Sequence, residues 1–91
     1  MALNPVVASA VGSMISSSVC VEAIVWDASS TAGDTVELRD PVDNRLLWCG
    51  RAADAYTYQG ISFGVSGLSC PNGVRLSQIS SGRVLVYSRV S

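Results

Sequence analysis

The sequence predicts an all-β fold: a small β-sandwich or barrel of about six to seven short antiparallel strands with an N-terminal arm. Two observations support this. Short segments alternate polar and apolar residues, which is the period of a half-buried strand. Turn signals rich in Gly, Asn, Asp and Ser recur every ~8–12 residues between these segments. We therefore expect an arm over residues 1–18 and one β-sandwich domain over residues 19–91.

The first segment, residues 1–18, carries no charged residue. It is too apolar for a typical disordered tail, and Gly12 together with the Val and Ser content disfavours a long helix. We expect an extended or briefly helical arm that contact with a neighbour orders, the alternative being a frayed terminus. The segment lacks the basic start of a signal peptide, and no run reaches the ~20 apolar residues of a membrane span. We therefore expect no membrane partner.

Three strands are expected between residues 19 and 50. In a regular strand over residues 19–26, Val19, Val21, Ala23 and Val25 would share one side, with Cys20, Glu22, Ile24 and Trp26 on the other. Residues 29–34 break this run. Residues 35–39 alternate again, and residues 40–44 have the composition of a turn that leads into a third strand over residues 45–49.

The second half of the chain continues the pattern. Residues 56–65 form one bent strand or two short ones, because Gly60 and Gly64 interrupt the run. A turn over residues 70–73 precedes an alternating strand over residues 74–78. The last strand, residues 83–88, is apolar on both sides over its centre, which indicates a central strand or an outer face covered by another subunit.

The composition is unusually apolar for so short a chain. Hydrophobic residues make up 48% of it and charged residues only 14%, against about 25% charged residues in ordinary soluble domains. A chain of this size buries only about 60–65% of its unfolded surface. We expect the excess apolar surface to be buried against partners; the alternative is an unusually apolar monomer.

The basic residues argue against nucleic acid as a partner. All six are Arg, they are scattered along the chain, and the net charge is −1, whereas a nucleic-acid interface requires a basic patch or stripe. Arg without Lys suits planar pairing with carboxylates at protein interfaces, and genomic base composition explains the same bias equally well.

Three cysteines, Cys20, Cys49 and Cys70, lie at wide spacings, and the chain has no His. This pattern argues against a zinc site. One disulfide plus a free thiol is one reading. We favour buried free thiols in a protein assembled in a reducing cytosol, because free Cys packs as a small hydrophobe.

The residues needed for common catalytic chemistry are missing. Without His there is no histidine acid–base pair or triad, and without Lys no Schiff base. Carboxylates could in principle form a glycosidase pair, but so small a domain leaves little room for a cleft. Residues 40–44 lack the ligand spacing of an EF-hand loop, which favours a plain turn. We expect no enzyme, no cofactor and no metal.

Three stretches together resemble a known family. They are IVWDASSTAGDTVELRD over residues 24–40, NRLLW over residues 44–48 and SGRVLVY over residues 81–87. They resemble small virion proteins of tailed bacteriophages, in which a strand ending in an aromatic residue precedes a Thr-Ala-Gly-Asp-like turn and a hairpin. The resemblance spans residues 19–88 and leaves out the arm and the cysteines.

The resemblance implies a non-enzymatic structural component of the virion. We expect a capsid decoration, or cement, protein on the capsid exterior, assembled in the host cytoplasm, binding the major capsid protein and forming a homotrimer. A tail or neck component is the alternative within the virion. A carbohydrate-binding adhesion module is an alternative of another class, with Tyr56, Tyr58, Trp26 or Trp48 stacking on sugars.

An interface of this kind is expected to use the apolar arm, the aromatic residues and the last strand. At least one Trp is expected in the core. The candidate interface residues are Val6, Val7, Val11, Met14, Ile15, Trp26, Trp48, Tyr56, Tyr58, Leu85 and Tyr87.

Overall fold

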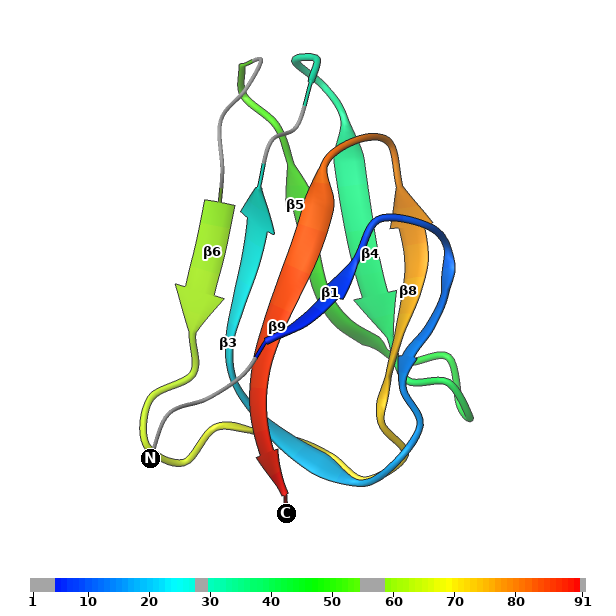
Figure 1. Cartoon of the computed structure of the whole chain (residues 1–91), viewed down its shortest axis with the longest axis vertical. Coiled ribbons are helices and arrows are strands. Elements are labelled where there is room, and N and C mark those ends of the chain that lie inside the picture. Colours follow the sequence, from blue (N-terminus) through cyan, green and yellow to red (C-terminus); the bar gives the residue numbers. More distant parts are fainter. Residues whose placement is uncertain (1–4, 28–29, 55–58, 91) are drawn as a thin grey trace.

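The computed structural model describes residues 5–27, 30–54 and 59–90, and these residues form nine antiparallel strands in two packed sheets, with no helix among them (Figure 1). The all-β sandwich prediction is confirmed. The first sheet contains β1 (Val6–Ala8), β9 (Arg83–Val90), β3 (Val19–Asp27), β6 (Gln59–Ser62) and β7 (Leu68–Cys70). The second contains β2 (Gly12–Ile15), β8 (Val74–Ile79), β4 (Thr35–Arg39) and β5 (Leu46–Arg51).

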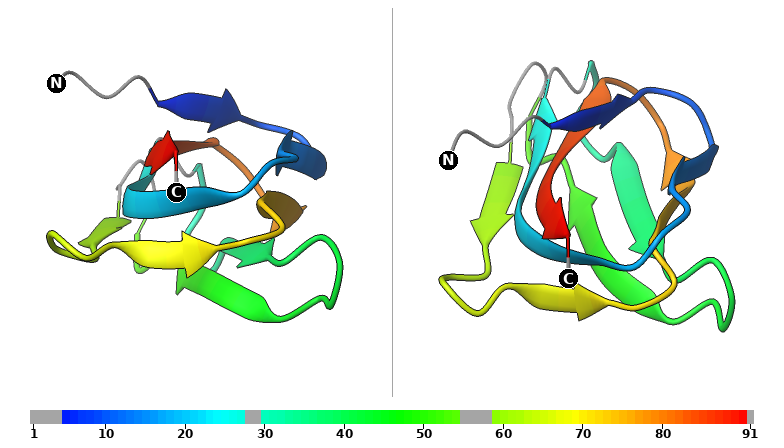
Figure 2. Two further views of the ribbon diagram at one scale, coloured as in Figure 1. Left: turned by 90° about the horizontal axis from the view of Figure 1, so that it is seen from below. Right: turned by 60° about the horizontal axis from the view of Figure 1, so that its bottom comes forward.

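The strand β3 organises the first sheet. It pairs along its whole length with β9, and β9 in turn pairs with β1. On its other side β3 pairs first with β7 and then with β6, so these two short strands share one edge of it (Figure 2). The strand β9 is therefore central in its sheet, which is one of the two positions that its apolar pattern predicted.

The N-terminal segment is built into both sheets. Its strand β1 pairs with β9 in the first sheet, and β2 pairs with β8 in the second, so the chain crosses from one sheet to the other between residues 8 and 12 (Figure 2). Ile15 is buried and Met14 packs against the core. The described part of the predicted arm therefore supplies two edge strands, because an extended apolar segment can satisfy its backbone groups by pairing. These two strands raise the count above the predicted six to seven.

A β-bulge at Glu22 changes which side of β3 faces the core. Val21 is paired with Ser88 and Ala23 with Tyr87, so Glu22 is the extra residue between them. As a result Val21 and Ile24 are both 1% exposed. The expected regular alternation, which placed these two residues on opposite sides, is wrong at this point because one inserted residue reverses the alternation beyond it.

The hydrophobic core lies between the two sheets and contains one tryptophan completely. Trp26 is 1% exposed, and its indole Nε1 donates a hydrogen bond to the carbonyl of Ser81 at 2.9 Å. The core role predicted for at least one Trp is confirmed. Trp48 is half-buried and packs against the same core. Full burial of a large apolar side chain contributes about 1.5–3 kcal/mol to stability. The other completely buried apolar residues are Val21, Ile24, Val36, Leu38, Cys70, Val74, Leu76, Val84 and Val86.

Candidate interaction surface

The outward side of the first sheet is apolar. Leu85 on β9 lies directly opposite Val7 on β1 and Val25 on β3, and Tyr87 lies opposite Ala23. Directly opposed residues project to the same side of a sheet, and successive residues alternate sides. Because Val84 and Val86 point into the core, these five residues point outward. We call Val7, Ala23, Val25, Leu85 and Tyr87 the apolar outer face.

Val7 is the most exposed member of this face, at 52%, whereas the other four are half-buried. The face combines residues from three strands that are far apart in the sequence. It consists of side chains without titratable groups, apart from the Tyr87 hydroxyl, so it offers contact area and no acid–base chemistry.

An ion pair borders each end of the apolar outer face. At one end Arg83 donates from Nε and Nη2 to Asp27 Oδ2 at 3.1 and 3.0 Å. At the other end Arg89 pairs with Glu22, the bulged residue of β3. In both pairs the arginine lies on β9 and the acid on β3.

Arg89 also fixes the turn between β6 and β7. Its Nη2 donates to the carbonyls of Val65 at 3.1 Å and Ser66 at 3.4 Å. The thiol of Cys20 donates to the same Ser66 carbonyl at 3.1 Å. This turn, residues 63–67, therefore presents Val65 at 93% exposure on an anchored backbone.

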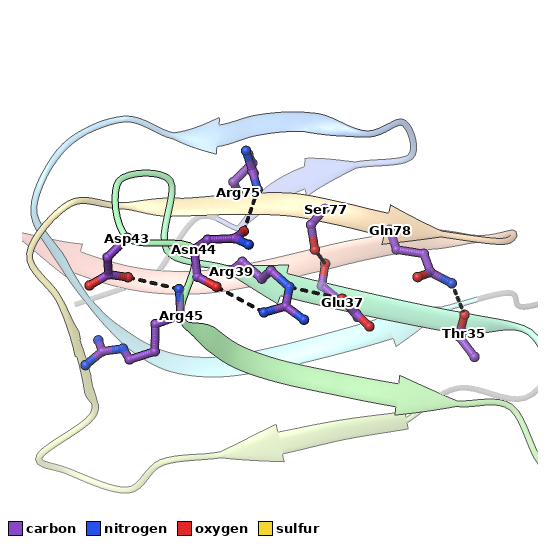
Figure 3. A network of polar contacts seen from close by, with 9 residues as sticks. All are labelled: Thr35, Glu37, Arg39, Asp43, Asn44, Arg45, Arg75, Ser77 and Gln78. Atoms are coloured by element: carbon purple, nitrogen blue, oxygen red, sulfur yellow. Dashed lines mark hydrogen bonds and ion pairs between the residues drawn. The ribbon is translucent and has the colours of Figure 1, made fainter.

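The outward side of the second sheet is polar (Figure 3). Arg39 donates from Nε to Glu37 at 3.1 Å and from Nη1 to the carbonyl of Asn44 at 3.0 Å. Arg75 Nη2 donates to Asn44 Oδ1 at 2.8 Å. These contacts tie β4, β8 and the β4–β5 turn together. We call this surface the polar outer face; Figure 3 draws its members Thr35, Glu37, Arg39, Asn44, Arg75, Ser77 and Gln78.

The β4–β5 turn is organised by Asp40, a carboxylate that is only 1% exposed. Its Oδ1 accepts hydrogen bonds from the backbone N–H groups of Val42 at 2.8 Å and Asp43 at 3.1 Å. The Asn72 side-chain amide donates to both carboxylate oxygens. The Val42 hydrogen bond is the main cause that lowers the pKa of Asp40; desolvation opposes it, and Asp43, Asn72 and Arg45 reinforce it. Both oxygens of the carboxylate therefore accept hydrogen bonds from protein donors.

The three cysteines are free thiols. Cys20 and Cys70 are buried, as we favoured, but Cys49 is exposed on the outward side of β5, opposite Glu37. Cys70 lies opposite Val19, the neighbour of Cys20, so the Cys20 and Cys70 side chains lie on opposite faces of the first sheet. Burial raises the pKa of the Cys70 thiol, which keeps it protonated and unreactive.

An open hollow of about 480 Å³ is lined by Ala32, Gly33, Arg51, Ala52 and Ala53. Among the described residues that line it, Arg51 alone is charged, so these residues supply no acid–base pair. Within the described ranges, no cluster of His, Cys, Asp or Glu could hold a metal ion. Those same ranges contain no helix suited to crossing a membrane.

The structure distributes the predicted interface residues over several environments. Leu85 and Tyr87 lie on the apolar outer face with Val7, and Val11 is exposed in the β1–β2 connection. Trp26 and Ile15 are buried, so they are not surface residues of this chain. Val6, Met14 and Trp48 are half-buried and pack against the core. Tyr56 and Tyr58 lie outside the described residues.

Sequence reasoning missed Ala23 and Val25 as members of the apolar outer face. The available signal was Glu22, the one charged residue between Val19 and Trp26, because a charge inside an apolar strand is compatible with a bulge.

Comparison of the chain with protein-family models, curated proteins and solved structures found no match.

Proposed function

We propose that this chain is a non-enzymatic virion structural protein of a tailed bacteriophage, a capsid decoration or cement protein that stabilises the lattice of the major capsid protein. The observation that carries the proposal is the contrast between the two outer faces of one small sandwich. One face is apolar and bordered by ion pairs, and the other is a hydrogen-bonded polar surface. Such a domain can contact two different surfaces at once.

The dimensions of the domain suit this role. It measures 35 × 28 × 16 Å along its principal axes, so it is thin compared with its width. A shell expanded by internal DNA pressure is stabilised by small proteins that bind across the junctions between capsomers. In this proposal the apolar outer face contacts other copies of the chain, and the polar outer face contacts the major capsid protein through charged and amide groups.

The segments that carry the family resemblance also lie together in the fold. Residues 24–40 and 44–48 contain the end of β3, all of β4 and the start of β5, while residues 81–87 contain the first part of β9. Two of these strands, β3 and β9, supply most of the apolar outer face. The stretches behind the resemblance therefore include part of the apolar outer face, which supports the virion role.

The alternatives receive less support. Of the four aromatic residues named for a carbohydrate-binding module, Trp26 is buried and Trp48 packs against the core, while Tyr56 and Tyr58 lie outside the described residues. For a tail or neck ring, the β4–β5 hairpin is the natural joining element, but its turn is short and fixed by Asp40. Glycan-array binding by the isolated chain would revive the first alternative, and loss of the protein from tailless heads would favour the second.

The test is the copy number on purified particles, measured by quantitative mass spectrometry against the major capsid protein. A decoration protein is expected in hundreds of copies per particle and on heads that lack tails. A handful of copies per particle would contradict the proposal.

A further inference from the structure

The charges at the two ends of the apolar outer face follow one rule. The acids, Asp27 and Glu22, both lie on β3, and the arginines, Arg83 and Arg89, both lie on β9. Because the two strands are neighbours, one side of the face is negative at both ends and the other side is positive at both ends. Between the two ion pairs lie two uncharged rows of side chains. One row consists of Val7, Leu85 and Val25, and the other of Tyr87 and Ala23.

We propose that the apolar outer face binds a second copy of the same chain, in a face-to-face pair whose two-fold axis runs parallel to β3 and β9. This axis places β3 of one copy over β9 of the other. Asp27 then meets Arg83 of the second copy, and Glu22 meets Arg89 of the second copy. A two-fold contact uses the same patch on both partners, so each complementary contact forms twice.

The same charges exclude the other face-to-face arrangement. A two-fold axis perpendicular to the strands, in the plane between the copies, places β3 over β3 and β9 over β9. Acids then oppose acids and arginines oppose arginines, which is unfavourable. The charge pattern therefore selects the second copy as the occupant of the face and also selects its orientation.

The apolar centre and the charged ends of the face correspond to the core and the rim of known protein interfaces. An apolar centre supplies most of the affinity, and a charged rim supplies orientation and specificity. The ion pairs are partly exposed within the single chain, so each contributes little to stability there. Contact with a second copy removes water from them and turns each pair into a network of four charges.

The expected oligomeric state of the isolated chain is therefore this dimer and not the homotrimer that the resemblance implied. Three copies around a three-fold axis make heterologous contacts between two different patches, whereas this face complements itself. The inference concerns the isolated protein and does not rest on the virion role. A low copy number on particles would therefore not contradict the dimer, and a monomeric isolated chain would not contradict the virion role.

The first test is sedimentation of the isolated chain. The unaltered protein is expected to be a dimer at micromolar concentration. Val7→Ser, which changes the most exposed side chain of the face, is expected to raise the dimer dissociation constant by about tenfold. Val42→Ser is the matched control, because Val42 is an exposed valine on the β4–β5 turn of the other sheet, and it is expected to leave the dissociation constant unchanged. A monomer at high micromolar concentration, a trimer, or equal effects of the two variants would overturn the proposal.

The second test exchanges the charges of one ion pair. A chain with Asp27→Arg and Arg83→Asp keeps the pair within each copy and the complementarity between two swapped copies. In a mixture with the isotope-labelled unaltered chain, a mixed dimer would bring like charges together. Asp27 of the unaltered copy would meet the new acid at position 83 of the swapped copy, and Arg83 of the unaltered copy would meet the new arginine at position 27. Native mass spectrometry is therefore expected to show both homodimers and few mixed dimers at low salt. Statistical mixing would overturn the proposed orientation, and the Val7 and Val42 variants test the face even if the swapped chain does not fold.

Discussion

Asn72 donates its side-chain amide to both carboxylate oxygens of Asp40, at 3.3 Å to Oδ1 and 3.2 Å to Oδ2. This contact joins the β4–β5 turn to the turn between β7 and β8. Since β7 belongs to the first sheet and β4 and β5 to the second, it links the two layers of the sandwich at one end. Asp40 is therefore a structural carboxylate, and the folded state favours its ionised form.

Acid is expected to weaken the fold through Asp40. The pKa of Asp40 is lowered in the folded state, and an unfolded Asp has a pKa of about 3.9. The stabilisation is therefore complete above the unfolded pKa, and it is lost as the pH falls through that value and then through the lower folded pKa. Urea unfolding between about pH 7 and pH 3 measures this loss.

The control for this prediction is Asp40→Asn. The substituted amide still offers one oxygen to Val42 and Asp43, but its NH₂ group would face the NH₂ group of Asn72. We expect lower stability at neutral pH and a flatter decline with acid than in the unaltered chain. If both proteins lose stability in parallel on acidification, Asp40 is not the group responsible.

Alanine substitutions at two glycines with positive φ are expected to distinguish the cost of backbone strain from the cost of a steric clash. Gly73 has a φ of 93°, and a Cβ there would lie 2.2 Å from the carbonyl oxygen of Ile15; Gly64 has a φ of 75° and open space around it. Gly64→Ala is expected to cost about 1–2 kcal/mol from strain alone. Gly73→Ala adds overpacking of about 1–3 kcal/mol to a similar strain. Thermal or urea unfolding of both variants checks the order, and equal losses would contradict the close approach.

The N-terminal strands are expected to contribute to the stability of the sandwich. If residues 1–18 were an arm outside the domain, as the sequence predicts, their deletion would leave the domain folded. The structure predicts a destabilised or unfolded domain instead, because Ile15 belongs to the core and β2 covers an edge of β8. Ile15→Ala is expected to cost about 2 kcal/mol, and the exposed Val11→Ala less than about 0.5 kcal/mol. A truncated chain that unfolds at the same urea concentration as the full chain would refute this.

Thiol labelling is expected to distinguish the three cysteines. Cys49 is exposed, whereas Cys20 and Cys70 are buried, and the raised pKa of Cys70 lowers its thiolate fraction further. An aromatic disulfide reagent at neutral pH should modify Cys49 quickly and the other two only after unfolding in urea. The variant Cys49→Ser should lose the fast phase, and a fast phase that persists would show that a buried thiol is accessible.

Local patterns made much of this fold predictable. The alternation over residues 35–39 and 74–78 and the turn composition of residues 40–44 each depend on near neighbours in the chain, and β4, β8 and the β4–β5 turn lie where these patterns place them. The two apolar sides of β9 predicted either a central position or a covered outer face, and β9 occupies the first of these. Of the residues that the sequence proposes for an interface, Val7, Leu85 and Tyr87 lie on the apolar outer face.

The sequence by itself determined the fold class, the main strands and the absence of His and Lys chemistry, because these follow from composition and from the two-residue period of a strand. Tertiary structure alone decided that β1 and β2 join different sheets, that Glu22 is bulged and that Asp40 is buried against Asn72. Each of these depends on which distant segment lies alongside, and a single inserted residue reverses every later side chain in a strand. The apolar outer face therefore becomes visible only when β1, β9 and β3 are side by side in register.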